Sequence, residues 1–163
     1  MEPRPSRSTG FPGLATTIIF VAAMLLGAAA GLGGFTFVYA RGSSYMTNDP
    51  AACANCHVMR EHYAAWQRSS HRAVAVCNDC HAPPGGLAKY WVKAKNGYRH
   101  SVAFTTGNFH EPIRITSSNR EVAEAQCRRC HAALVSAITA HGGADDDVSC
   151  IRCHDSVGHR TSD

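Results

Sequence analysis

The sequence predicts a mainly α protein with much irregular loop, composed of one N-terminal transmembrane helix and a compact domain of short helices. Two observations support this prediction. Thirty consecutive residues, 11–40, carry no charged side chain. The rest of the chain holds all eight cysteines in four copies of one short motif, without a βαβ pattern. We therefore expect a cytoplasmic N-terminus over residues 1–13, a membrane span over 14–38 and the compact domain over 41–163.

The uncharged run is long enough to cross a membrane. About twenty apolar residues span the hydrocarbon core of a bilayer. Aromatic side chains near the C-terminal end of the run fit the belt that lies at a membrane surface, and they are Phe35, Phe37 and Tyr39. Arg4 and Arg7 precede the run, which favours a cytoplasmic N-terminus and an exported domain.

A cleaved secretory signal is the alternative interpretation of this segment. Val38-Tyr39-Ala40 resembles a small-x-small cleavage site. The apolar part of a signal peptide is typically about 7–15 residues long, however, and this run is twice that. We therefore expect an uncleaved anchor. Gly27 and Gly31 form a GxxxG pattern that can bring two helices together, which allows a homodimer within a larger complex.

The motif Cys-x-x-Cys-His dominates the rest of the chain. It indicates covalent attachment of haem c, because two thiols bond to the haem vinyl groups and the adjoining histidine can reach the iron. The four copies use every cysteine, in the pairs Cys53 and Cys56, Cys77 and Cys80, Cys127 and Cys130, and Cys150 and Cys153. The histidines that complete them are His57, His81, His131 and His154. A disulfide scaffold, zinc sites and a thioredoxin-like motif do not explain this pattern.

Four haems are therefore expected within residues 41–163, at about thirty residues per haem. The haems must then form much of the apolar core themselves, with short helices around them. The net charge of +4 does not require a nucleic-acid partner, because basic side chains pair naturally with haem propionates.

The spacing of the motifs shows two pairs separated by a long spacer. The first cysteines lie 24, 50 and 23 residues apart, as in a duplicated two-haem unit. Within the spacer, the turn signal at residues 83–86 is followed by an expected helix over 87–104. Residues 108–118 are expected to form a loop, and 121–126 a helix leading into the third motif. Lys93 and His100 lie two helical turns apart on one face of the expected spacer helix.

Histidines outside the motifs are candidates for the remaining iron ligands. Four haems have eight axial positions, and the motif histidines can fill four of them. His71 lies between the first two motifs, and His159 lies five residues beyond the last. We expect both to be distal ligands. His100 is a weaker candidate, and the others, His62, His110 and His141, are weaker still.

Met59 makes the first motif unusual, since it stands two residues after His57. Methionine ligation raises the reduction potential of a haem. A thioether this close to His57 cannot reach the opposite face of the same haem, so Met59 would replace His57 on the same side. Packing of Met59 against the porphyrin is the alternative.

These features together resemble the NapC/NirT family of membrane quinol dehydrogenases. The resemblance covers nearly the whole chain. It is carried by the membrane helix, the four motifs, Cys-x-x-Cys-His-x-Met in the first and Cys-Asn-Asp-Cys-His-Ala-Pro in the second. The stretch His100-Ser-Val-Ala-Phe-Thr and the ending Cys-His-Asp-Ser-Val-Gly-His159 are also similar to the branch of the family that serves nitrite reduction.

The resemblance implies a function and assigns roles to residues. It implies a cytochrome anchored in the bacterial inner membrane, with its haem domain in the periplasm. Menaquinol would be oxidised near the first haem, and electrons would pass to a pentahaem catalytic subunit that reduces nitrite to ammonium. Met59 would be the unusual ligand of the first haem, and Lys93 the quinol-site lysine. His100 stands where some family members have an acidic group, and it would be a proton acceptor or a ligand.

Three other functions fit the same sequence features. A quinol dehydrogenase of this family could serve another periplasmic reductase. A soluble tetrahaem electron shuttle would result from cleavage of the N-terminal segment. A terminal reductase could act on its substrate at the first haem, although no segment marks a dedicated substrate pocket.

Overall fold

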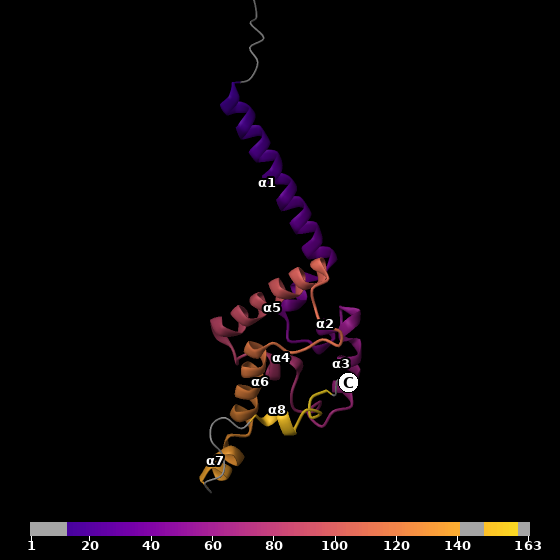
Figure 1. The fold of residues 1–163 in the computed structure, drawn as a ribbon, viewed down its shortest axis with the longest axis vertical. Helices are drawn as coiled ribbons and strands as arrows, with labels where there is room; N and C mark the ends of the chain where they lie inside the picture. Colours follow the sequence, from indigo (N-terminus) through magenta and orange to yellow (C-terminus); the bar gives the residue numbers. More distant parts are fainter. Residues whose placement is uncertain (1–12, 141–148, 160–163) are drawn as a thin grey trace, which may run out of the picture. The chain divides into compact units, whose positions relative to one another are not determined.

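The computed structural model describes residues 13–140 and 149–159, which form helices joined by turns and irregular segments (Figure 1). No strand occurs among these residues, and the expected mainly α fold class is confirmed. The elements in chain order are α1 (Leu14–Tyr39), η1 (Gly42–Met46), α2 (Pro50–Cys53), η2 (His57–Met59), α3 (Arg60–Gln67), α4 (Cys77–His81), α5 (Gly86–Thr106), α6 (Ser117–Cys130), α7 (Ala132–Ala140) and α8 (Cys150–Cys153).

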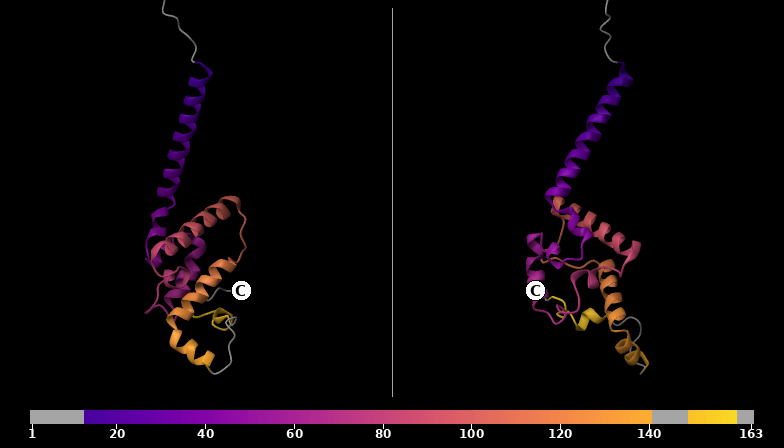
Figure 2. Two further views of the ribbon diagram at one scale, coloured as in Figure 1. Left: turned by 90° about the vertical axis from the view of Figure 1, so that its left-hand side faces the viewer. Right: turned by 180° about the vertical axis from the view of Figure 1, so that it is seen from behind.

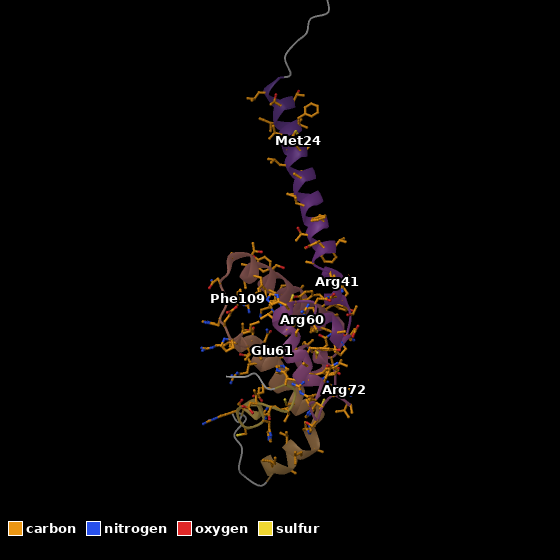
Figure 3. The ribbon with its side chains drawn as sticks, turned by 90° about the vertical axis from the view of Figure 1, so that its right-hand side faces the viewer. Met24, Arg41, Arg60, Glu61, Arg72 and Phe109 are labelled. Carbon is orange, nitrogen blue, oxygen red and sulfur yellow. The ribbon has the colours of Figure 1, made fainter. Side chains whose placement is uncertain are left out.

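Helix α1 belongs to a unit of its own, which ends at Gly42. Its 26 residues extend about 39 Å at 1.5 Å per residue, and a bilayer core is about 30 Å thick. None of its residues is buried. Figure 3 shows side chains, Met24 among them, projecting outward from the helix. It is the only helix among the described residues that is long and apolar enough to cross a membrane.

The cysteine motifs in the second unit lie on or beside single helical turns. Helix α4 spans the second motif, α8 holds both cysteines of the fourth, and the third motif occupies the last turn of α6. Residues three apart on a helix lie on the same face, so the two sulfurs of each of these motifs point to one side. The first motif differs, because Cys53 ends α2 and Cys56 precedes the turn η2.

The spacer helix is slightly longer than expected. Helix α5 covers residues 86–106, against the expected 87–104. It ends at Gly107, whose left-handed conformation, with φ of 69°, favours glycine. Its cap N–H bonds to the carbonyl of Ala103.

Helices α6 and α7, which follow the spacer, differ from the sequence-based prediction. Helix α6 begins at Ser117, four residues before the expected start at 121. Residues Ser-Ser-Asn occupy its first turn; they favour helix starts and turns, which is why a loop was expected there. Helix α7, which follows the third motif directly, was not predicted at all.

The second unit has almost no apolar core made of protein. Among the described residues, the only buried apolar side chains are Ala82 and Ala123, at 2% and 7% exposed. Two alanines cannot supply the apolar burial that stabilises a domain of this size. Covalently attached haem groups would fit this architecture, because porphyrin rings held at the Cys-x-x-Cys-His motifs would provide the missing apolar mass.

Glu124 on α6 fixes the position of the fourth motif. Its carboxylate accepts hydrogen bonds from the backbone N–H groups of Cys150, at 2.8 Å, and Ile151, at 3.1 Å, and from the Ser149 hydroxyl. Burial alone would raise the pKa of Glu124, but these hydrogen bonds hold it below its ordinary value. The side chain therefore caps α8 from another helix.

Replacing Glu124 by alanine should destabilise the haem-loaded protein. The lost cap is worth about 1–2 kcal/mol of unfolding free energy, and the urea midpoint should fall accordingly. Because the pKa of Glu124 is lower in the folded state, its contribution is full above pH 4.5 and is lost as the pH falls through the folded pKa. The urea midpoints of the wild-type protein and the Glu124→Ala variant should therefore converge in acid. Glu121→Ala, an exposed position on the same helix, is the control; equal midpoints for the two variants at neutral pH would contradict the capping role.

Candidate functional site

The first two cysteine motifs touch each other. The side chains of Cys53 and Cys77 share a hydrogen bond, which lowers the pKa of Cys53 to about 7 and raises that of Cys77. Groups attached to the first and second motifs would therefore be neighbours.

The second, third and fourth motifs continue this arrangement. Burial, then Asp79 and then Cys130 raise the pKa of Cys80, so the second motif lies near the third. Burial and then Cys150 raise the pKa of Cys127, so the third lies near the fourth. The four motifs are thus neighbours in the order of the chain, as a row of electron carriers requires.

His71 pairs with the histidine of the third motif. The ring centroids of His71 and His131 are 6.2 Å apart, at an interplanar angle of 72°. Two imidazoles bound to opposite faces of one metal ion have centroids roughly 6.3 Å apart, given metal–nitrogen bonds of about 2 Å. The Nδ1 atom of His71 lies 3.1 Å from the carbonyl oxygen of Val157. Donation of Nδ1–H to this carbonyl leaves Nε2 available for a metal, which is the usual arrangement of a ligating histidine.

His159 pairs with the histidine of the second motif. The ring centroids of His81 and His159 are 5.9 Å apart, and the rings are nearly parallel at 12°. Burial and then the nearby His62 lower the pKa of His81. Burial, followed by His81 and His62, lowers the pKa of His159 to about 4. Both rings are therefore neutral near pH 7, which is the form that binds a metal. The structure thus brings both expected distal ligands to a motif histidine.

The other motif histidines have no such partner among the described residues. His57 and His154 are exposed, and no histidine ring pairs with either within residues 13–140 and 149–159. Met59 is half-buried at the end of η2. His110 is exposed, and His141 lies outside the described residues.

Lys93 on α5 is buried, at 8% exposed. Its ammonium donates hydrogen bonds to the carbonyl oxygen of Thr47, at 2.6 Å, and to Oδ1 of Asn48, at 3.4 Å. Asn78, within the second motif, donates to the same two oxygens at 3.0 and 3.1 Å. Burial and then Lys89 lower the pKa of Lys93, while nearby Cys53 acts in the opposite direction. A lysine held by neutral acceptors beside the first motif retains a third N–H for a ligand.

His100 faces the same segment of the chain as Lys93. Its Nδ1 lies 2.8 Å from the hydroxyl of Tyr45 in η1. Desolvation lowers the pKa of His100, and burial is the main cause of the raised pKa of Tyr45, followed by the nearby Cys56 and Cys53. The adjacent Ser44 accepts a hydrogen bond from Asn55 of the first motif. Segment 44–48 therefore gathers Lys93 and His100 beside the first motif.

Sequence reasoning did not identify several residues of this site. Tyr45 and Asn48 carry no recognisable pattern, because each acts through a contact with a distant part of the chain. The sequence identifies Asn78 only as part of the second motif, and His62 only as a weak candidate for an iron ligand. The aromatic residues of α5 are largely exposed: Tyr90, Trp91 and Tyr98 are 53%, 71% and 73% exposed. They lie on the same helix as Lys93, but the ammonium of Lys93 bonds to segment 44–48.

Comparison with known proteins finds similar sequences over most of the chain. The profile of the family described as "NapC/NirT cytochrome c family, N-terminal region" matches residues 14–163. Cytochrome c-type protein NrfH of Wolinella succinogenes is 35% identical over 153 residues, covering 87% of this chain and 86% of that protein. Cytochrome c nitrite reductase subunit NrfH of Nitratidesulfovibrio vulgaris is 32% identical, covering 69% of each chain.

A more distant relative and a solved structure extend the comparison. Cytochrome c-type protein TorC of Escherichia coli is 27% identical over 145 residues, which are 37% of its length. The fold also matches a chain in the crystal structure of the cytochrome c nitrite reductase NrfHA complex bound to the inhibitor HQNO. That match has a TM-score of 0.58 and 28% identity, and it covers 85% of this chain and 99% of that one.

Removing either paired distal histidine should change the spin state of one haem. His71→Ala and His159→Ala each delete one ring of a pair at ligand distance. Electron paramagnetic resonance of the oxidised protein should then show one low-spin signal fewer in each variant. His110→Ala, at an exposed histidine, should leave the spectrum unchanged. Unaltered low-spin signals in both variants would show that these residues are not ligands.

Proposed function

The chain belongs to the NapC/NirT cytochrome c family, and we propose that it is the membrane-anchored tetrahaem electron-transfer subunit of a cytochrome c nitrite reductase. The observation that carries this proposal is the similarity to two NrfH proteins over most of their length, together with the fold match to a chain of the NrfHA complex. Family membership implies covalently bound haem c. The four Cys-x-x-Cys-His motifs support a count of four.

The proposed electron donor is menaquinol, oxidised beside the first motif. Quinol oxidation releases two protons, which a haem does not accept, so neighbouring bases must take them. Two groups support this site. Lys93 has a free N–H that can bind a quinol oxygen, and neutral His100 can accept a proton at Nε2 when its Nδ1 proton is donated to Tyr45. When bound, the haems supply a row of one-electron carriers.

Ligation in the proposed scheme follows the paired rings. His81 with His159, and His131 with His71, would each bind one iron from its two faces. Met59 would bind the first iron in place of the exposed His57. His154 has no histidine ring beside it among the described residues, so the fourth iron is expected to take a ligand from the catalytic subunit.

The proposed partner is a pentahaem catalytic subunit that reduces nitrite to ammonium. In this scheme α1 anchors the protein in the bacterial inner membrane, and the haem domain lies in the periplasm. A homodimer within the complex would use Gly27 and Gly31, where an added Cβ would meet no atom within 4 Å. The main alternative is a quinol dehydrogenase that serves another periplasmic reductase. The shares of the relatives' lengths that are matched favour the nitrite reductase partner, since the chain spans 86% of one NrfH but 37% of TorC.

Reconstitution tests this function directly. The purified protein should carry four haems by mass, retain its N-terminal helix and partition with membranes. In proteoliposomes, a menaquinol analogue should reduce the haems, and the catalytic subunit with nitrite should reoxidise them. Reduction by dithionite but not by quinol would exclude the donor site. Reoxidation only through another periplasmic reductase would favour the alternative partner, and a soluble chain starting at Arg41 would exclude the anchor.

Lys93→Ala should slow haem reduction by a menaquinol analogue by at least about tenfold, since acid–base and positioning groups contribute factors of this size or more. Reduction by dithionite should be unaffected. Lys95→Ala on the same helix removes a lysine that bonds to Ser118 instead, and serves as the control. Because Lys93 also holds segment 44–48, the haem count must be measured in parallel. Loss of haem together with activity would indicate a structural lysine.

The rate of quinol oxidation should fall as the pH drops through the pKa of His100. That pKa lies below the ordinary value of 6.5, so the base is neutral at pH 7 and protonated only in more acidic solution. His100→Asn keeps a polar atom at the Nδ1 position for Tyr45 but removes the Nε2 base. It should lower the rate by roughly 10²-fold and abolish this acidic limb. A mutant with an unchanged pH profile would exclude His100 as the proton acceptor.

A further inference from the structure

His62 is a third histidine beside the His81–His159 pair. It lies on α3, and its ring meets the ring of His159 edge-on, with centroids 5.1 Å apart and an interplanar angle of 66°. His159 therefore lies beside two imidazoles, with His81 at 5.9 Å. The C-terminal segment that carries His159 is drawn in yellow beside the violet and magenta residues of α3 and the loop after it (Figure 2).

Two nitrogens in this cluster are buried without a hydrogen-bond partner, and both are Nδ1 atoms. They belong to His62 and His159. Buried polar atoms are nearly always hydrogen-bonded, so each unsatisfied one requires an explanation. Here the two occur on adjacent rings, and each can satisfy the other: one neutral imidazole donates N–H and the other accepts at a bare nitrogen.

The distance between the rings suits such a bond. Two imidazoles joined by one N–H···N hydrogen bond of about 2.9 Å have centroids roughly 5.2 Å apart, against 5.1 Å observed. The separation of the two rings is therefore that of a hydrogen-bonded pair of imidazoles.

The other expected distal ligand, His71, has a hydrogen-bond partner of the kind that His159 lacks. His71 has a partner for its Nδ1 in the carbonyl of Val157, at 3.1 Å. Metal-bound histidines almost always donate their second ring N–H to an acceptor, which fixes the tautomer and increases the basicity of the ligand. Apart from a weak interaction with its own backbone, which slightly raises its pKa, Nδ1 of His159 makes no hydrogen bond within the part of the chain that the structure describes, and His62 is the imidazole packed against it.

We propose that His62 is a positioning residue for the haem bound between His81 and His159, and that its Nδ1 accepts a hydrogen bond from Nδ1–H of His159. This inference rests on the ligand pairing of the proposed function. The bond holds His159 in the tautomer that presents Nε2 to the iron. By making the ligand more basic it stabilises ferric iron, and so lowers the reduction potential of this haem.

Two substitutions separate the hydrogen bond from the packing. His62→Phe keeps a ring but removes the acceptor, whereas His62→Asn places an amide oxygen where Nδ1 stood. In the haem-loaded protein, His62→Phe should shift one low-spin electron paramagnetic resonance signal and raise one reduction potential. A tenfold weakening of ferric relative to ferrous ligation, at the low end for such a change, corresponds to about 59 mV. His62→Asn should restore both readouts, and His110→Phe should alter neither.

Several outcomes would overturn the proposal. Unchanged spectra and potentials in His62→Phe would show that His62 does not act on the ligand. Equal effects of Phe and Asn would indicate packing alone. Retention of every low-spin signal in His159→Ala, with loss of one in both His62 variants, would make His62 the ligand itself and refute the underlying pairing. If His62→Phe does not assemble, pulsed electron–nuclear double resonance on the wild-type protein decides, since an axial-imidazole proton without a hydrogen bond contradicts the proposal.

Discussion

One constraint shapes the rest of the structure: the polypeptide provides almost no apolar core of its own. Two alanines are the buried apolar side chains of the described part of the haem domain. Attached haems explain how such a domain can be stable, since each macrocycle offers a large apolar surface fixed at a helical turn. The polypeptide therefore differs from that of an ordinary domain. It supplies cysteines and histidines at defined positions, and polar contacts hold its short helices together.

Those polar contacts are concentrated in a few places. Segment 44–48 receives Lys93 and Asn78 at its backbone and Asn48, and it offers Tyr45 to His100. It thereby joins α5 to the first two motifs and defines the proposed quinol site. Glu124 plays a comparable part at the opposite end of the row of motifs, where it caps α8 from α6. These junctions are made by hydrogen bonds of polar side chains, most of them with a charged or amide group, and not by large apolar contacts.

The C-terminal segment links two of the proposed haem centres. Val157 accepts the hydrogen bond that orients His71, and two residues later His159 lies beside His81. One short stretch thus orients the ligand of one centre and supplies the ligand of the next. Disturbance of this stretch would affect both centres, which would couple the properties of neighbouring electron carriers along the row.

The sequence by itself determined the features that depend on local spacing. Cys-x-x-Cys-His marks its own attachment chemistry, the uncharged run gives α1, and helical periodicity places Lys93 and His100 on one face of α5. The tertiary structure alone decided the partners of these residues. His71 meets Val157 across 86 positions and Lys93 meets Thr47 across 46. No periodicity extends over such separations, and one acceptor is a backbone carbonyl that every residue possesses. Which histidine faces which motif, and how Tyr45 and His62 support them, is therefore set by packing between helices that the sequence pattern does not specify.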